Sequence, residues 1–423
     1  MQRRRILCLV LSGMIALTAT SVEVTSAGAA SSSQGVTSNT VKVAILTSLT
    51  GPIAPLYANA VKAFEAPIDA QNAKGGVDGR KIVVVPEDDA SSVPGALAAA
   101  QDAVGNKDVF ALAAVSTATE GPTRYLYQQG VPVVGASYEG GFGTLPYTNM
   151  FGADTGSIDQ HYPAFTLPGT FYKEKGATNV AVLGFTDPGS TATSKAGALS
   201  FKKAGLKVGY ENLSLSYGNS DFSTEVVAMK NAGIDAIYAP TSNTTELGLY
   251  KQAIQAGIKV KVMDQVTTYG PALAKSSDWN TLVKGNAYFQ LGWLPAQVHN
   301  AASAAMMANL EQYGGYKASD FPDFGAMEGY LAATLFIKGL QVAGKDLTRQ
   351  SFINNLRQVK SYNANGLIPE TINFSTVFGH DPNPTCYYFL TAKPSGFVPL
   401  SNSPVCGTKI PNSNQIANPA SVG

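Results

Sequence analysis

The chain has 423 residues, of which 45% are hydrophobic and 14% are charged. This length and apolar content suffice for two domains with buried cores. The formal net charge is only +1, which argues against a nucleic-acid binder that depends on neutralising phosphates. Glycine and proline follow no repeat, so the chain is not collagen-like.

The first thirty residues have the pattern of a secretory signal peptide. Three arginines at positions 3–5 precede a mostly apolar run over residues 6–19, which is too short to cross a bilayer that needs about 20 residues. Ala27-Gly28-Ala29 then has the form of a cleavage site. We therefore predict a signal peptide over residues 1–30 and a soluble protein exported to the periplasm or cell envelope. A short N-terminal membrane anchor is the alternative.

Strands and helices alternate along the rest of the chain. The apolar runs predicted as strands are Val41–Leu46, Lys81–Val85, Val109–Val115, Val131–Val134, Val180–Leu183, Leu206–Tyr210, Ile234–Ala239 and Lys259–Met263. The segments predicted as helices lie around residues 61–73, 93–104, 119–129, 158–174, 190–203, 222–231 and 245–256. Continuous apolar strands that alternate with helices are typical of parallel sheets covered on both faces.

A second group of helices is predicted over residues 301–313, 327–343 and 348–359. Helices need a sheet to cover, so we expect this group to pack back on the first sheet. The fold class is therefore α/β, with two doubly wound parallel-sheet lobes joined by three hinge crossovers. We predict lobe 1 from residues 40–153 and 294–366, and lobe 2 from residues 154–293 and 367–410.

The two cysteines of the exported chain are Cys386 and Cys406. An even pair in an oxidising compartment predicts a disulfide, and catalysis by a Cys–His pair is the alternative. The segment between them reads as a hairpin with strands over residues 387–390 and 396–399. Residues 411–423 are predicted to be a flexible tail.

The common catalytic and cofactor motifs are absent from the sequence. There is no phosphate-binding GxxxxGK[ST] loop, no HExxH and no paired-cysteine metal motif. The glycines around residues 140–143 do not have dinucleotide-binding spacing, and Ser137 lacks the second glycine of a nucleophile elbow. We therefore predict no cofactor, no metal site and no catalytic residue.

The candidate binding residues lie in polar loops directly after strands, where open parallel sheets bind ligands. They are Tyr57, Ser116, Thr117, Ser137, Tyr138, Glu139, Asp187, Ser242, Asn243, Asp264 and Gln265. Ser116 and Thr117 precede a helix, so they either hold a carboxylate or cap that helix. Glu139 either meets a cationic group or is a solvated surface carboxylate, and Asp187 either binds ligand or only caps the next helix.

Three motifs resemble, in order and spacing, those of the periplasmic binding proteins of the leucine/isoleucine/valine-binding type. They are Ser48-Leu49-Thr50-Gly51-Pro52, the stretch NAKGGVDGRKI over residues 72–82, and Glu87-Asp88-Asp89. The resemblance covers most of residues 41–400. It implies two α/β lobes that close on a small molecule and deliver it to an ATP-driven (ABC) permease.

The resemblance also implies roles for particular loops. In amino-acid binders of this type, the loop matching Ser116-Thr117 holds the ligand carboxylate, with help from the loop matching residues 137–139. An acidic residue that pairs with the ligand ammonium is expected near residues 264–266. The expected partners are a small amino-acid-like, amide or aromatic or organic-acid ligand and a membrane permease, with no nucleic acid, and the expected state is a monomer.

Two other functions share these features. One is a ligand-sensing subunit that reports to a receptor, which would use the same cleft. The other is a secreted α/β hydrolase, which would need a base beside its nucleophile. The only histidines are His161, His299 and His380, and none lies in a predicted cleft loop.

Overall fold

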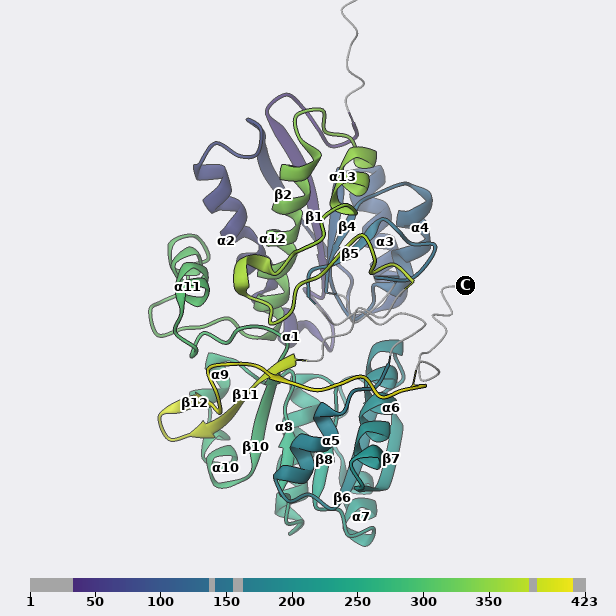
Figure 1. The fold of residues 1–423 in the computed structure, drawn as a ribbon, viewed down its shortest axis with the longest axis vertical. Coiled ribbons are helices and arrows are strands. Elements are labelled where there is room, and N and C mark those ends of the chain that lie inside the picture. The colour runs from purple at the N-terminus through teal and green to yellow at the C-terminus, as the bar shows by residue number, and fades with distance from the viewer. Residues whose placement is uncertain (1–32, 137–140, 155–162, 380–385, 414–423) are drawn as a thin grey trace, which may run out of the picture. The chain divides into compact units, whose positions relative to one another are not determined.

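The computed structural model describes residues 33–136, 141–154, 163–379 and 386–413. Helices and strands alternate along this part of the chain, and the strands form two sheets (Figure 1). The predicted signal peptide and most of the predicted tail lie outside the described residues. No described helix is long and apolar enough to cross a membrane.

The first sheet has five parallel strands in the order β2-β1-β3-β4-β5. The strands are β1 (Thr40–Thr47), β2 (Lys81–Asp88), β3 (Ala111–Val115), β4 (Val133–Gly135) and β5 (Met150–Gly152). Along β1, Val43 and Ile45 belong to one buried cluster and Ala44 and Leu46 to another. Successive side chains point to opposite faces of a strand, so both faces of this sheet are covered, as the apolar runs predict.

Helices from two distant parts of the chain cover the first sheet. They are α1 (Ala54–Tyr57), α2 (Ala60–Ala73), α3 (Val93–Gly105), α4 (Glu120–Gln128), α11 (Ala301–Tyr313), α12 (Phe324–Ala343) and α13 (Arg349–Leu356). The late helix α12 packs against α2, β3 and β4, and α13 packs on α12. The expectation that the late helices return to the first sheet is confirmed. We call the five-stranded sheet with these helices the first lobe.

Two glycines let α12 lie close against α1 and α2. A Cβ atom at Gly329 would collide with the backbone carbonyl of Ala60, and one at Gly325 would collide with that of Leu56. Asp323 caps α12 by accepting from the backbone amide of Ala326 at 2.9 Å, and it also accepts from the Asn59 side chain at 2.6 Å. The start of α12 is therefore held against the segment between α1 and α2.

The second sheet has eight strands, five of them parallel in the order β7-β6-β8-β9-β10. They are β6 (Asn179–Phe185), β7 (Lys207–Leu215), β8 (Ala236–Tyr238), β9 (Val262–Asp264) and β10 (Ala287–Leu291). The predicted hairpin, β11 (Cys386–Lys393) and β12 (Gly396–Pro399), adds antiparallel strands beside β10, and β13 (Val405–Cys406) pairs with β11. Strands β5, β10 and β13 were not predicted.

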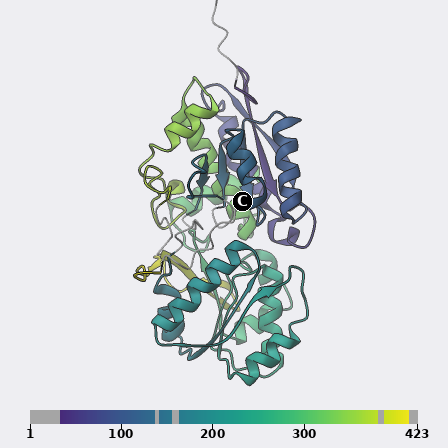
Figure 2. The same ribbon diagram turned by 90° about the vertical axis from the view of Figure 1, so that its right-hand side faces the viewer.

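Among the described residues, six helices accompany the second sheet, and helices lie on both of its sides (Figure 2). They are α5 (Leu167–Glu174), α6 (Pro188–Lys203), α7 (Ser223–Asn231), α8 (Asn243–Gln255), α9 (Pro271–Ala274) and α10 (Trp279–Lys284). The predicted helix over residues 158–174 is wrong at its start, because Phe165 pairs with Lys409 as an isolated bridge and α5 begins at Leu167. Proline at the second position of α5 suits a helix start. We call this sheet with its helices the second lobe.

Two of the segments that run between the lobes are joined by a backbone hydrogen bond. The amide of Leu294, after β10, donates to the carbonyl of Leu367 at 2.7 Å. Leu367 itself follows the short 3-10 helix η1 (Ala364–Gly366). The disulfide between Cys386 and Cys406 is present and closes the end of the hairpin segment.

We predict that Gly329→Ala lowers the free energy of unfolding by about 1–3 kcal/mol, because the added methyl forces α12 away from α2. Urea unfolding followed by circular dichroism measures this. Gly105→Ala is the matched control, since that glycine ends α3 with nothing within 4 Å of an added Cβ. The control variant should be as stable as the parent or slightly more stable, and an equal loss in both variants would contradict the packing argument.

We also predict that the double variant Cys386→Ser, Cys406→Ser loses about 3 kcal/mol of stability, as expected for a disulfide that closes a loop of this length. Thermal melting with and without dithiothreitol provides the measurement. The reductant should lower the melting temperature of the parent to that of the double variant and leave the double variant unchanged. If the parent unfolds reversibly and its melting temperature is the same with and without dithiothreitol, the disulfide does not stabilise the protein.

Candidate ligand-binding site

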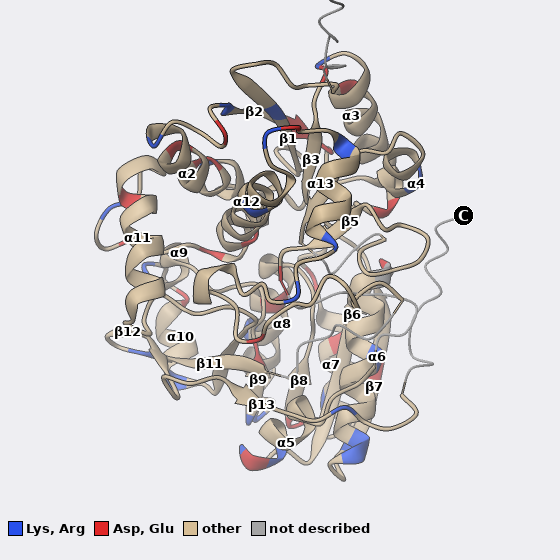
Figure 3. Ribbon diagram, turned by 45° about the horizontal axis from the view of Figure 1, so that its top comes forward, with Lys and Arg blue, Asp and Glu red and all other residues tan. Residues whose placement is uncertain are grey.

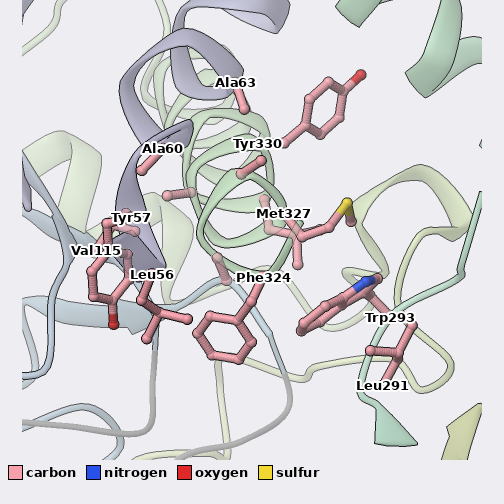
Figure 4. Packing of buried hydrophobic residues seen from close by; sticks show 14 of the residues in the cluster. Leu56, Tyr57, Ala60, Ala63, Val115, Leu291, Trp293, Phe324, Met327 and Tyr330 are labelled. Carbon is pink, nitrogen blue, oxygen red and sulfur yellow. The ribbon is translucent and has the colours of Figure 1, made fainter. Parts of the chain in front are cut away.

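A cavity of about 200 Å³ is lined by residues of both lobes. From the first lobe and the segment after β5 come Ile53, Leu56, Tyr57, Thr117, Asp154, Phe324 and Glu328. From the second lobe and its connections come Phe165, Pro168, Phe185, Asp187, Gly189, Ser190, Thr193, Ala196, Gly197, Tyr217, Tyr238, Pro240, Thr241, Ser242, Val266, Thr267, Gln290, Gly292, Trp293 and Tyr387. Figure 4 shows Leu56, Tyr57, Phe324 and Trp293 around the start of α12.

The structure brings four of the predicted binding residues to this cavity, namely Tyr57, Thr117, Asp187 and Ser242. Four others do not line it, namely Ser116, Asn243, Asp264 and Gln265. Ser137, Tyr138 and Glu139 lie outside the described residues and stay predictions.

The side chain of Ser116 is turned into the protein. It is fully buried, its hydroxyl donates to the Asp89 carboxylate, and its oxygen accepts from the backbone amide of Ala118 at 2.9 Å. The hydroxyl hydrogen is therefore used by a carboxylate 27 residues earlier in the chain. Thr117, the next residue, is the one that faces the cavity.

Asp187 both caps a helix and lines the cavity. One carboxylate oxygen accepts from the backbone amide of Ser190 at 2.8 Å, at the start of α6, and the other accepts from the Tyr217 hydroxyl at 2.8 Å. Asp187 thus holds the aromatic ring of Tyr217 at the cavity wall and neutralises the positive end of α6.

Ser242 precedes α8, and its hydroxyl bonds to that of Thr245 at 3.1 Å. Asn243 is the first residue of α8 and accepts from the backbone amide of Thr244, away from the cavity lining. Glu246, in the first turn of α8, is fully buried and accepts from the amides of Val266 and Thr267 at 3.1 and 2.9 Å. Burial raises the pKa of Glu246 well above its ordinary value.

Asp264 is the last residue of β9 and Gln265 follows it, and both are buried without lining the cavity. Burial raises the pKa of the Asp264 carboxyl to about 8, opposed by the nearby backbone amide of Gln290. Gln265 accepts from the hydroxyl of Thr268 at 2.7 Å. The residues that follow them, Val266 and Thr267, reach the cavity instead.

Several cavity residues were not predicted. Glu328 lies in the apolar helix α12, Gln290 in the unpredicted strand β10, and Trp293 just after it. Trp293 packs edge-on against Phe324 at 5.6 Å between ring centroids. Glu328 lies inside a helix and Gln290 inside a strand, where a search of the loops that follow strands does not look, and Trp293 follows a strand that was not predicted.

Glu120, in the first turn of α4, is a further acidic group near the cavity. Burial raises its pKa to about 7, and the negative charge of Asp187 adds to the rise. Its Oε2 atom has no hydrogen-bond partner among the described residues. Its position directly after Ser116–Thr119 is the sequence signal that could have identified it.

The histidines give no catalytic arrangement within the described residues. His299 lines a separate cavity at the start of α11, with Asn300 and Glu311 among its neighbours. His161 and His380 lie outside the described residues.

Comparison with known proteins decides the family. The family model for periplasmic binding proteins matches residues 40–396. The chain belongs to the periplasmic binding protein family. The sequence predicts two lobes, each built on a sheet of mainly parallel strands, and the structure has these two sheets.

Curated relatives of this family member are amino-acid-binding proteins by name. The leucine-, isoleucine-, valine-, threonine- and alanine-binding protein of Pseudomonas aeruginosa is 25% identical over 330 residues, which cover 74% of this chain and 81% of that protein. The Leu/Ile/Val-binding protein of Citrobacter freundii is 25% identical over 53% of this chain and 60% of its own length.

Solved structures of similar fold have varied ligands in their titles. A fatty acid ABC transporter substrate-binding protein from Thermomonospora curvata has a TM-score of 0.72 at 20% identity and covers 90% of this chain and 95% of its own. A solute-binding protein from R. palustris in complex with benzoate has a TM-score of 0.71 at 17% identity, covering 89% and 99%. At these identities the likeness establishes the type I periplasmic-binding fold alone.

We predict that Asp264→Asn makes stability less dependent on pH. In the parent, the folded carboxyl keeps its proton up to about pH 8, whereas the unfolded one releases it near pH 4. The folded state therefore binds more protons in this window, and stability contributed by this group falls as pH rises from about 4 to 8. Each pH unit in this window costs the parent about 1.4 kcal/mol, so the variant should gain roughly 3–4 kcal/mol relative to the parent between pH 5 and pH 8.

Asp221→Asn is the control for this experiment, because Asp221 is exposed and its pKa is lowered by hydrogen bonds from Ser223. Its titration lies below pH 5, so the difference between this variant and the parent should stay constant from pH 5 to 8. A constant difference for Asp264→Asn as well would show that Asp264 is already ionised in the folded state.

Proposed function

We propose that this protein captures a small solute in the cavity between its lobes and delivers it to an ABC importer. The observation that carries the proposal is that residues of both lobes line one cavity, in a member of the periplasmic binding protein family. The amino-acid, fatty-acid and benzoate ligands named for its relatives and fold neighbours support a small organic ligand.

A solute that contacts both lobes favours the closed arrangement of the lobes. A ligand that contacts both α12 and the loops after β6 and β8 favours the arrangement in which those surfaces are close, because only such differential contacts shift a conformational equilibrium. The hinge segments around Leu294 and Leu367 allow the change. The membrane permease then recognises the closed arrangement.

We also propose which residues contact the solute, where the protein acts and which residues form each lobe. Tyr57, Thr117, Asp187 and Ser242 contact the solute, while Ser116, Asp264 and Gln265 support the loops beneath it. The protein is not an enzyme, acts as a monomer and is exported after cleavage near residue 29. Residues 40–153 with 294–366, and 154–293 with 367–410, are the two lobes.

Calorimetric titration with a panel of amines, amino acids, amides, aromatic acids and fatty acids tests the proposal. We expect saturable one-to-one binding of at least one compound, and Tyr217→Ala should weaken that binding about tenfold or more, since an aromatic wall is lost. Tyr127→Ala is the control, because Tyr127 is exposed on α4 outside the cavity. Failure of the whole panel to bind, or equal loss in both variants, would contradict the proposed site.

A further inference from the structure

The charged residues that line the cavity are all acidic. Among the described residues they are Asp154, Asp187 and Glu328, with no lysine, arginine or histidine. Basic residues lie elsewhere, for example Lys202 and Lys203 in the last turn of α6. Figure 3 shows the lysines and arginines of the described chain in blue. An anionic solute would therefore enter this cavity without an ionic partner from the described chain.

Glu328 is the most informative of these acids. It lies one turn into α12, is 1% exposed, and its Oε2 atom has no hydrogen-bond partner among the described residues. Burial raises the pKa of Glu328 well above its ordinary value, and the negative charge of Asp154 adds to the rise. A buried polar group normally has a partner, so a carboxyl that lines a cavity without one calls for a donor on the ligand.

Four of the hydroxyl groups that line the cavity donate their hydrogens to other groups of the protein. Ser190 donates to the carbonyl of Pro240 at 2.6 Å, Thr241 to that of Ala239 at 3.1 Å, and Thr267 to that of Thr241 at 3.1 Å. The hydroxyl of Tyr217 donates to Asp187. These four groups offer lone pairs to a ligand rather than hydrogens, and Gln290 adds a buried Oε1 atom without a partner among the described residues. The indole Nε1 of Trp293 is a buried donor at the same cavity without a partner among the described residues.

The helix starts near the cavity also have acidic side chains of their own. Glu120 is in the first turn of α4, Asp187 caps α6, and Glu246 is in the first turn of α8. A bare helix N-terminus attracts anions. Of these, Asp187 accepts from the Ser190 amide in the first turn of α6, so that helix end is already occupied by an acidic side chain of the protein.

The remaining walls suit a positive charge with an apolar body. Aromatic residues that line the cavity are Tyr57, Phe165, Phe185, Tyr217, Tyr238, Trp293, Phe324 and Tyr387. Aromatic faces attract cations, most strongly where water is excluded, and they also cover apolar groups.

Resting on the proposed function, we propose that the solute is an organic cation, a compact amine or amidinium with an aromatic or branched apolar body. Its charged nitrogen lies at Glu328 and Asp154 and donates to the unpartnered oxygen of Glu328. Its apolar part packs against the aromatic walls.

Matched ligands of one shape and different charge test the inference by calorimetry at neutral pH. The first set is benzylammonium, benzyl alcohol and benzoate, and the second is 3-methylbutylammonium, leucine and 4-methylpentanoate. The ammonium compound should bind about tenfold or more tightly than its neutral, zwitterionic or anionic counterpart. Within the wider panel of amines, amino acids, amides and acids, the tightest binder should likewise be a cation.

Glu328→Gln keeps the shape of the side chain but cannot form the carboxylate that a bound cation favours, so it should weaken cation binding about tenfold or more without changing binding of the alcohol. Glu311→Gln, at an exposed position on α11, is the matched control. Melting curves check that both variants fold. Cation binding by Glu328→Gln equal to that of the parent would overturn the inference.

The two proposals fail differently. A carboxylate or a zwitterion as the tightest binder overturns the cationic solute and leaves the solute-binding function intact. A panel in which no compound binds saturably removes the proposed function together with the inference.

Discussion

The close contact of α12 with α1 and α2 is the constraint on which the first lobe and its share of the cavity depend. Gly325 and Gly329 permit this contact, since a side chain at either position would meet backbone. The same helix then covers β3 and β4 and brings Phe324 and Glu328 to the cavity. Packing of the lobe and placement of its binding groups are thus set by one helix, so a change that shifts α12 affects both.

The sequence predicted the architecture well because its strands are buried on both faces. Runs such as those of β1, β3 and β6 are continuously apolar, and the glycines that follow the helices mark where each helix ends. Strand β5 was missed because it has only three residues, and β10 because Gln290 interrupts its apolar pattern. The start of α5 was missed because Phe165 pairs with a residue near the other end of the chain.

The residues that line the cavity were harder to predict than the strands and helices, because side-chain orientation depends on tertiary contacts. The rule that ligands bind after strands led to the loops of Thr117, Asp187 and Ser242, which line the cavity. It could not say that Ser116 would turn toward Asp89, because that contact joins two different strands. Glu328 sits in an otherwise apolar helix, where sequence gives no sign of whether a carboxyl meets a partner or a cavity. The position of a loop after a strand can be predicted from the sequence, whereas the set of charged groups around a cavity depends on how distant segments pack together.

The return of α12 to the first sheet has a consequence for the order in which the protein can fold during synthesis. Strand β3 is complete at Val115, but the helix that covers one of its faces begins at Phe324, so that face stays uncovered until roughly 200 more residues have emerged from the ribosome. The second sheet waits in the same way for β11 and β12. Neither lobe can reach its final packing as an N-terminal fragment, and the nascent chain exposes apolar strands through most of its translation.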